Sequence, residues 1–278
     1  TDGNAIDDSQ FYSSVIAGGL ETQPDSWREQ NWPLSSANQI HRLTELRYVD
    51  GIRRLKSNSV DEHGNYLDPQ PIDLTSARPN PPEEEFGIGM YNYGEGLYFD
   101  IKPAWLNDLG RQRMSMGEHR ANMSVSFDKL MHSMTKQLPA LEEEDSRSAF
   151  TVLHTFSHLL IKSLVAKSGF SLGSVRERLY FDYEDGNVKH AGILLYTSAP
   201  SSDGTLGGLV QQGSSVSKID EIVQAALESL EFCSNDPICF EHLPTADETN
   251  GAACHTCVLL PETSCELANH MLDRNWGV

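Results

Sequence analysis

The sequence predicts an α+β fold, in which a mixed sheet packs against helices and a cysteine-rich module occupies the C-terminal end. Three observations support this prediction: two segments with helical periodicity, two strand-like runs joined by a short turn, and five cysteines that all lie between Cys233 and Cys265. Hydrophobic residues make up 38% of the 278 positions and charged residues 22%, which is enough apolar material for a folded core. The chain is therefore expected to be globular.

The strongest helical pattern covers residues 150–168, where apolar side chains recur on one face and Gly169 is the expected C-terminal stop. A second amphipathic helix is expected over 216–232. Helical patterns over 104–137 and 39–48 are weaker. In the second of these, apolar residues three to four apart predict a short helix or an irregular packed turn.

Three runs are rich in the β-branched, aromatic and aliphatic residues that strands prefer. They cover residues 94–101, 179–183 and 191–197, and the last two are joined by a turn at Asp185-Gly186-Asn187. The third run is apolar enough to be a central strand of the sheet. These runs supply the β part of the predicted α+β fold.

The composition divides the chain into three expected regions. Residues 1–86 form an N-terminal lead-in with a basic segment and an acidic, proline-rich linker; residues 87–232 form the α+β core; and residues 233–278 form the cysteine module. The runs of apolar residues are far shorter than the roughly 20 that a membrane helix requires, and residues 1–10 show no secretion signal. We therefore expect a cytoplasmic protein.

The charge balance excludes a basic surface that covers the whole chain. Lys and Arg total 21 and Asp and Glu total 40, so the formal net charge is −19. A local positive patch for nucleic-acid phosphate remains open, because acidic residues can face elsewhere. The alternative is that these arginines are solvated or paired internally. The candidates for contact with nucleic acid or a partner are Arg42, Arg47, Arg53, Arg54, Arg176 and Arg178.

The clustered cysteines predict a metal site rather than a disulfide framework, because an odd number of cysteines in one short segment does not staple distant loops. Cys254-x2-Cys257 is the informative pair, since its short turn lets two thiolates meet one tetrahedral zinc ion. Cys239 and Cys265 lie closest in sequence to this pair and are expected to complete the site, with Cys233 as the alternative fourth ligand.

Other interpretations of the cysteine segment remain open. The thiols can be small buried apolar groups, or the Cys-x2-Cys pair can be redox-active. His242, His255 and His270 are nitrogen alternatives for the metal, although four thiolates already satisfy zinc and ordinary surface positions are expected for them.

His154 and His158 lie four residues apart on the strongest helix, so their side chains share one face. This spacing can hold a metal, but the sequence shows no third ligand. The two residues are expected either to be hydrogen-bonded in the core or to contact a nucleic acid or a partner. An alternative is a metal-assisted hydrolase that uses both histidines with Asp203, from a glycine-rich loop over 203–208 that lacks the lysine of a nucleotide-binding loop.

Several motifs together resemble the DUF1998 domain, also called the MrfA-type zinc-binding domain. They are His154-Thr-Phe-Ser-His158, Ser174-Val-Arg-Glu-Arg178, Gly192-Ile-Leu-Leu-Tyr-Thr197, Gly251-Ala-Ala-Cys-His-Thr-Cys257 and Glu262-Thr-Ser-Cys265-Glu. Upstream, His41-Arg-Leu-Thr-Glu-Leu-Arg47 and Gly94-Glu-Gly-Leu-Tyr98 resemble the DrmB family of the DISARM anti-phage system.

The resemblance implies zinc as the cofactor, held by the cysteines named above. It also implies a noncatalytic accessory subunit that associates with a DrmA-like helicase subunit, which hydrolyses ATP, and that assists binding of DNA directly or through that partner. It carries no catalytic residue to this chain, which shows no helicase motif of its own.

Overall fold

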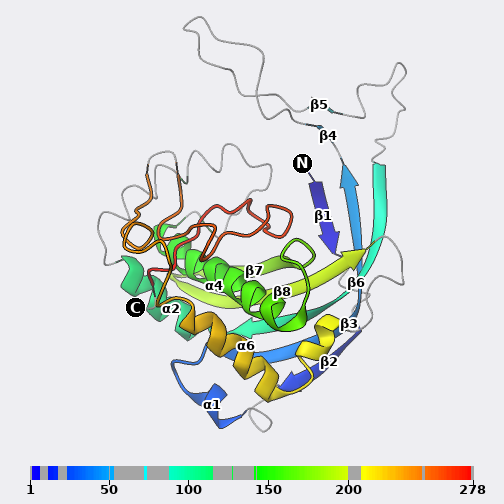
Figure 1. The fold of residues 1–278 in the computed structure, drawn as a ribbon, viewed down its shortest axis with the longest axis horizontal. Coiled ribbons are helices and arrows are strands. Elements are labelled where there is room, and N and C mark those ends of the chain that lie inside the picture. The colour runs from blue at the N-terminus through cyan, green and yellow to red at the C-terminus, as the bar shows by residue number, and fades with distance from the viewer. Residues whose placement is uncertain are drawn as a thin grey trace, which may run out of the picture.

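The structure is a computed structural model, and it describes residues 2–6, 12–17, 24–49, 51–52, 72–73, 88–114, 127, 141, 143–199, 208–245 and 248–276. A six-stranded sheet has the order β1-β3-β6-β8-β7, with β2 also paired to β3, and helices pack on one of its faces (Figure 1). The strands of this sheet are β1 (Asp2–Ile6), β2 (Tyr12–Ala17), β3 (Leu34–Val49), β6 (Ile88–Ile101), β7 (Arg176–Glu184) and β8 (Asn187–Ala199). The short strands β4 (Gly51–Ile52) and β5 (Ile72–Asp73) pair separately. The helices are α1 (Asp25–Arg28), α2 (Pro103–Met114), α4 (Glu144–Ser168), α5 (Gly208–Gln212) and α6 (Val216–Glu228).

The α+β class is confirmed, but the sheet is antiparallel in every pairing within the described residues, whereas a mixed sheet was expected. The reason is the path of the chain after β6. After the connection through α2 and α4, β7 runs in the same direction as β6, with room for one strand between the two. The hairpin then returns β8 into the position between them, so each neighbouring pair is antiparallel.

Residues 39–48 lie in the long strand β3, so the expected short helix or packed turn is wrong. Ile40 and Leu43 are three residues apart and imitate helical spacing. A register shift in the pairing with β6 lies between them, and both side chains consequently reach the same face of the sheet, where they pack with Leu194 and Tyr196. A β-bulge therefore produced the helix-like pattern.

Helix α4 forms the centre of the core, and Gly169 ends it as expected, with φ at 76° and its N–H donating to the carbonyl of Val165. Phe156 is fully buried, and its ring centroid lies 5.3 Å from that of Trp105 on α2. By length and composition alone α4 could cross a membrane, but 78% of the relevant window is buried inside the protein, as in a core helix.

The expected turn between β7 and β8 is confirmed. Asp185 and Gly186 both have positive φ, 51° and 72°, the combination that a two-residue hairpin turn requires. The second amphipathic helix is confirmed as α6, which ends at Glu228. Of the helix expected over 104–137, the structure describes the first part as α2, which ends at Met114. In the expected lead-in, Trp27 is fully buried and donates to Asp220 of α6 over 2.5 Å.

Candidate metal centre

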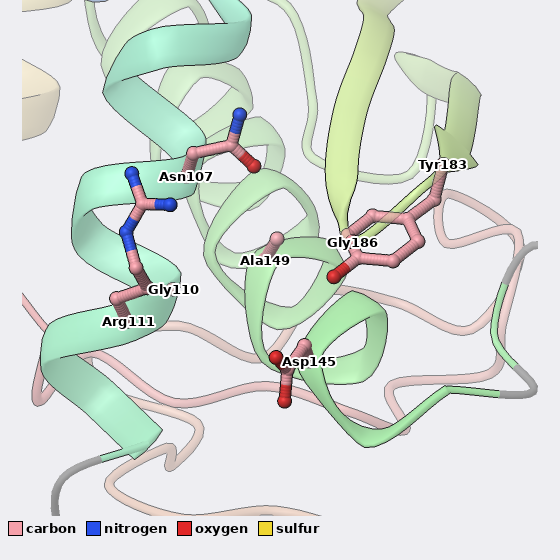
Figure 2. Close-up of a pocket in the computed structure, with 7 residues that line it drawn as sticks. All are labelled: Asn107, Gly110, Arg111, Asp145, Ala149, Tyr183 and Gly186. Carbon is pink, nitrogen blue, oxygen red and sulfur yellow. The ribbon is translucent and has the colours of Figure 1, made fainter.

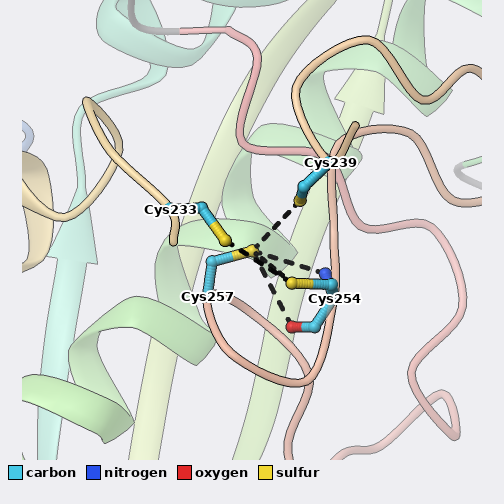
Figure 3. Close-up of side chains that lie close together, drawn as sticks. All are labelled: Cys233, Cys239, Cys254 and Cys257. Carbon is cyan, nitrogen blue, oxygen red and sulfur yellow. Dashed lines mark hydrogen bonds between the residues drawn. The ribbon is translucent and has the colours of Figure 1, made fainter. Parts of the chain in front are cut away.

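Four cysteines from the part of the chain after α6 bring their sulfur atoms together (Figure 3). Cys254 and Cys257 are 3.5 Å apart, Cys233 and Cys254 are 3.6 Å apart, and Cys239 and Cys257 are 3.6 Å apart, all measured between Sγ atoms. A tetrahedral ion with metal–sulfur bonds of about 2.3 Å requires sulfur separations of roughly 3.8 Å. The four sulfurs thus already stand close to the geometry of a closed structural zinc site.

The membership of this centre differs from the expected set by one residue. Cys233 is the fourth ligand candidate, and Cys265 lies elsewhere, with His154, His158 and Glu177. Nearness in sequence to the Cys-x2-Cys pair was a poor guide. The carbonyl of Ser264 accepts a hydrogen bond from the N–H of Glu177 on β7, which fixes Cys265 beside that strand.

Hydrogen bonds to sulfur support the centre. The N–H of Cys254 donates to the Sγ of Cys257 over 3.3 Å, the N–H of Asn235 donates to the Sγ of Cys233 over 3.4 Å, and the side-chain amide of Asn235 donates to the Sγ of Cys254 over 3.3 Å. Burial opposes ionisation of Cys254, but its hydrogen bonds from Cys257 and Asn235 outweigh burial and lower its pKa to about 6. One thiolate is therefore available for a cation at neutral pH.

The backbone around the cysteines is tied to the core by buried polar contacts. Arg274 is fully buried, pairs with Asp236 and donates to the carbonyl of Leu230 over 2.8 Å. Burial lowers the pKa of Arg274, but the hydrogen bonds to Asp236 and Cys239 outweigh it and raise the pKa. A permanent cation therefore joins the end of α6 to the Cys233–Cys239 segment.

The Cys-x2-Cys turn is fixed from two further sides. Lys162 on α4 donates to the carbonyls of His255 and Thr256 over 3.3 and 3.2 Å. On the other side, Asp273 accepts from the N–H of Ala252 over 3.0 Å and lies so close to Gly251 that a Cβ there would collide with its carboxylate. This contact explains why glycine precedes the turn.

The structure also bears on the alternatives to a four-cysteine metal site. All five thiols are free, so no disulfide connects them. The Cys-x2-Cys pair follows an irregular segment rather than opening a helix, which does not favour a redox pair. His242 contacts the carbonyl of Gly251, His270 contacts Thr249, and His255 is exposed. Among the residues that the structure describes, none of the three belongs to a group of potential metal ligands.

A second group of potential ligands lies where α4 meets β7. His154, His158, Glu177 and Cys265 are buried, and their ligand atoms all lie within 4.8 Å of one another. Burial alone would lower the pKa of His154, but the charges of Cys265 and Glu177 outweigh burial and raise it well above its usual value. Burial would likewise raise the pKa of Glu177, but the two imidazoles hold it well below its usual value.

The burial of His154 and His158 decides which of their expected roles the structure allows. Both imidazoles are 0% exposed, so in this structure neither can contact a nucleic acid or a partner, and a substrate cannot reach them. The hydrolase alternative is therefore not favoured, and Asp203 lies outside the described residues. Sequence reasoning missed Glu177. Strand alternation was the available signal, because Glu177 must face the opposite way from Arg176 and Arg178 on either side of it.

The arginines on β7 are paired internally, one of the two outcomes left open. Arg176 lies 3.7 Å from Glu45 and Arg178 lies 3.1 Å from Glu266, nitrogen to oxygen, so each guanidinium group has a carboxylate partner within the protein. Arg42 is exposed on β3. The side chain of Arg47 and the whole of Arg53 and Arg54 lie outside what the structure describes.

A small pocket lies between α2, the start of α4 and the β7–β8 turn (Figure 2). Arg111, Asp145 and Tyr183 are among its lining residues, and its volume is about 80 Å³. Sites for small-molecule ligands usually enclose about 300 Å³ or more. The pocket is therefore too small to be a substrate site.

Comparison with known proteins places this geometry in a family. Residues 156–258 match the MrfA Zn-binding domain. The chain is 31% identical over 257 residues to the DISARM protein DrmB of Bacillus paralicheniformis, in an alignment that covers 92% of this chain and 42% of that protein, so the chain spans less than half the length of this relative. A crystal structure of the DUF1998 helicase MrfA bound to DNA has a TM-score of 0.35 and 10% identity, covering 88% of this chain and 23% of that one, and at this level it supports no argument.

The matched segment contains all four cysteines of the sulfur cluster and excludes Cys265. Four thiolates at tetrahedral separations are the donor set of structural zinc. Residues 156–258 thus belong to the MrfA-type zinc-binding domain family, the chain as a whole is a relative of DISARM protein DrmB, and zinc is the metal of its four-cysteine centre.

Proposed function

We propose that this chain belongs to a noncatalytic accessory subunit of a cytoplasmic anti-phage defence complex, which associates with a DrmA-like helicase subunit and assists DNA binding. The observation that carries the proposal is the alignment with DISARM protein DrmB over 92% of the chain. The helicase partner and the DNA are inferred from the resemblance of the sequence to the DrmB family. In this account the zinc centre is structural, because four thiolates leave no open coordination position for a substrate or water.

The zinc module has an exposed apolar surface that suits a protein partner. Phe232 and Ile238 each lie one position before a zinc ligand, and they are 74% and 82% exposed. Large apolar side chains held on a rigid frame are favourable anchors in protein interfaces. We infer that the helicase subunit contacts the protein here.

Replacing Phe232 and Ile238 with serine is expected to weaken binding to the helicase subunit by about tenfold or more, because each side chain would lose apolar contacts with the partner. Binding is measured by titrating the purified helicase subunit, and zinc content is measured in the same samples. The zinc content should stay unchanged.

The matched control for this experiment is a second exposed apolar pair among the described residues, Met90 and Tyr91 on β6, which are 48% and 60% exposed. Serine at these two positions should leave helicase binding unchanged. If the Met90 and Tyr91 variant loses binding while the Phe232 and Ile238 variant keeps it, the partner surface has been assigned to the wrong end of the protein.

Replacing Arg42, Arg47, Arg53 and Arg54 with glutamate is expected to reduce the DNA affinity of the assembled complex. Loss of phosphate contacts should also flatten the dependence of log affinity on log salt, by about 0.9 for each contact removed. DNA binding is measured over a salt series, with Arg111→Glu, an exposed arginine on α2, as the control. Identical salt slopes for the fourfold variant and the unmodified protein would exclude direct DNA contact through this segment.

A further inference from the structure

We propose that the protein binds a second zinc ion, separate from the four-cysteine centre, between His154, His158, Glu177 and Cys265. The ligands come from three parts of the fold: α4 supplies both histidines, β7 supplies Glu177, and the C-terminal segment supplies Cys265. Such an ion would join the end of the chain to the central helix and the edge strand.

The four ligand atoms have separations that suit one tetrahedral ion. His154 Nε2 lies 3.0 Å from Glu177 Oε1 and 3.2 Å from Cys265 Sγ, and His158 Nε2 lies 3.4 Å from the same oxygen of Glu177. Zinc bonds of about 2.0 Å to nitrogen and oxygen and 2.3 Å to sulfur require separations of roughly 3.3 Å between nitrogen and oxygen and roughly 3.6 Å between nitrogen and sulfur. Small shifts outward would therefore admit the ion.

His158 is held in the orientation and tautomer that a metal ligand needs. Its Nδ1 lies 3.1 Å from the carbonyl oxygen of Val258. A carbonyl can only accept, so Nδ1 carries the proton and the lone pair of the neutral ring is on Nε2. Nε2 is fully buried, has no hydrogen-bond partner among the described residues, and faces the carboxylate. A backbone carbonyl on the far nitrogen is the usual support of a metal-binding histidine.

The sulfur of Cys265 has the surroundings of a thiolate. The N–H groups of Leu267 and Asn269 point at its Sγ over 3.4 and 3.1 Å. Two backbone donors on one sulfur stabilise negative charge. Glu177 is supported in the same way, since its Oε2 accepts from the hydroxyl of Ser157 and its Oε1 accepts from the N–H of Glu266 over 3.2 Å.

The charge balance is compatible with a bound cation. A carboxylate and a thiolate buried side by side carry two negative charges, and one divalent ion would neutralise them when both imidazoles are neutral ligands. The side chains of His154, His158 and Glu177 are 0% exposed, so no substrate reaches them. Their donor set, with Cys265, of two nitrogens, one oxygen and one sulfur suits zinc. The site is closed, so the ion would be structural.

The first test is the metal content and ligand environment of the unmodified protein, purified without chelator or added metal. Elemental analysis should find two zinc ions per chain. X-ray absorption at the zinc edge should find, averaged over both ions, about 2.5 sulfur and 1.5 nitrogen or oxygen ligands per zinc. One zinc per chain with four sulfur ligands would overturn the proposal, and this measurement depends on no variant.

The second test uses variants that separate the two sites. Cys265→Ser and His158→Gln should each lower the content from two zinc ions to one, and the remaining ion should have only sulfur ligands. Cys233→Ser should instead leave an ion with mainly nitrogen and oxygen ligands. His270→Gln, at a half-buried histidine of the same C-terminal segment, is the matched control and should keep both ions. Two zinc ions in a folded Cys265→Ser variant would also overturn the proposal.

Discussion

Cys257→Ser is expected to remove the ion of the four-cysteine centre and to lower the free energy of unfolding by more than about 4 kcal/mol, because loss of a structural metal belongs to the most damaging class of substitution. The Sγ of Cys257 is close to two other sulfurs of the centre, at 3.5 Å from that of Cys254 and 3.6 Å from that of Cys239. Its loss would leave three ligands and free the whole Cys233–Cys257 segment. Chemical denaturation and zinc analysis of the same preparation measure the two effects.

His255 provides the control, because it lies inside the same Cys-x2-Cys turn but is exposed and belongs to neither ligand group. His255→Ala should keep the zinc content and change stability by no more than about 0.5 kcal/mol. A Cys257→Ser protein that retained its full zinc content and its stability would show that the four sulfurs do not share an ion.

Phe156→Ala is the second substitution with a large expected effect. The side chain is 0% exposed and packs against Trp105 in the centre of the core, so its removal should leave a cavity and lower the free energy of unfolding by about 3–5 kcal/mol. The midpoint of thermal unfolding should fall by about 10 °C. Calorimetry or circular dichroism on heating measures this change.

The matched control is Phe232→Ala, the same chemical change at a phenylalanine that is 74% exposed. It should change stability by about 0.5 kcal/mol or less. Zinc analysis of the Phe156→Ala protein is informative as well, because retention of the metal would show that the centre tolerates a loosened core. Equal effects of the two substitutions would contradict the placement of α4 at the centre of the core.

Sequence reasoning succeeded where a structural signal is local. The helix over 150–168 has its apolar face and its glycine stop within one segment, and the turn at Asp185-Gly186 needs only two residues that tolerate positive φ. The Cys-x2-Cys pair is equally local, since its spacing alone brings two sulfurs within reach of one ion. All three features were predicted and lie where they were expected.

Sequence reasoning failed where the answer depends on which distant segments meet. The helix-like spacing of Ile40 and Leu43 arises from a bulge that exists only because β3 pairs with β6. Glu177 was overlooked between two arginines, although its partners are on α4 and in the C-terminal segment, 23 residues before it and 89 residues after it. Strand alternation around Glu177 indicated only which way its side chain faces, and nothing within either stretch of chain identifies the distant segments that it meets.

The sequence by itself determined that this protein has an α+β core, a cluster of thiols suited to zinc and a resemblance to the DUF1998 domain, because these properties depend on composition, periodicity and short spacings. Tertiary structure alone decided that Cys233 joins the zinc centre and that Cys265 lies with His154, His158 and Glu177. The physical reason is that a metal ion selects ligands by distance in space. Packing of α6 against α4 sets that distance for Cys233, and the contact of Ser264 with β7 sets it for Cys265.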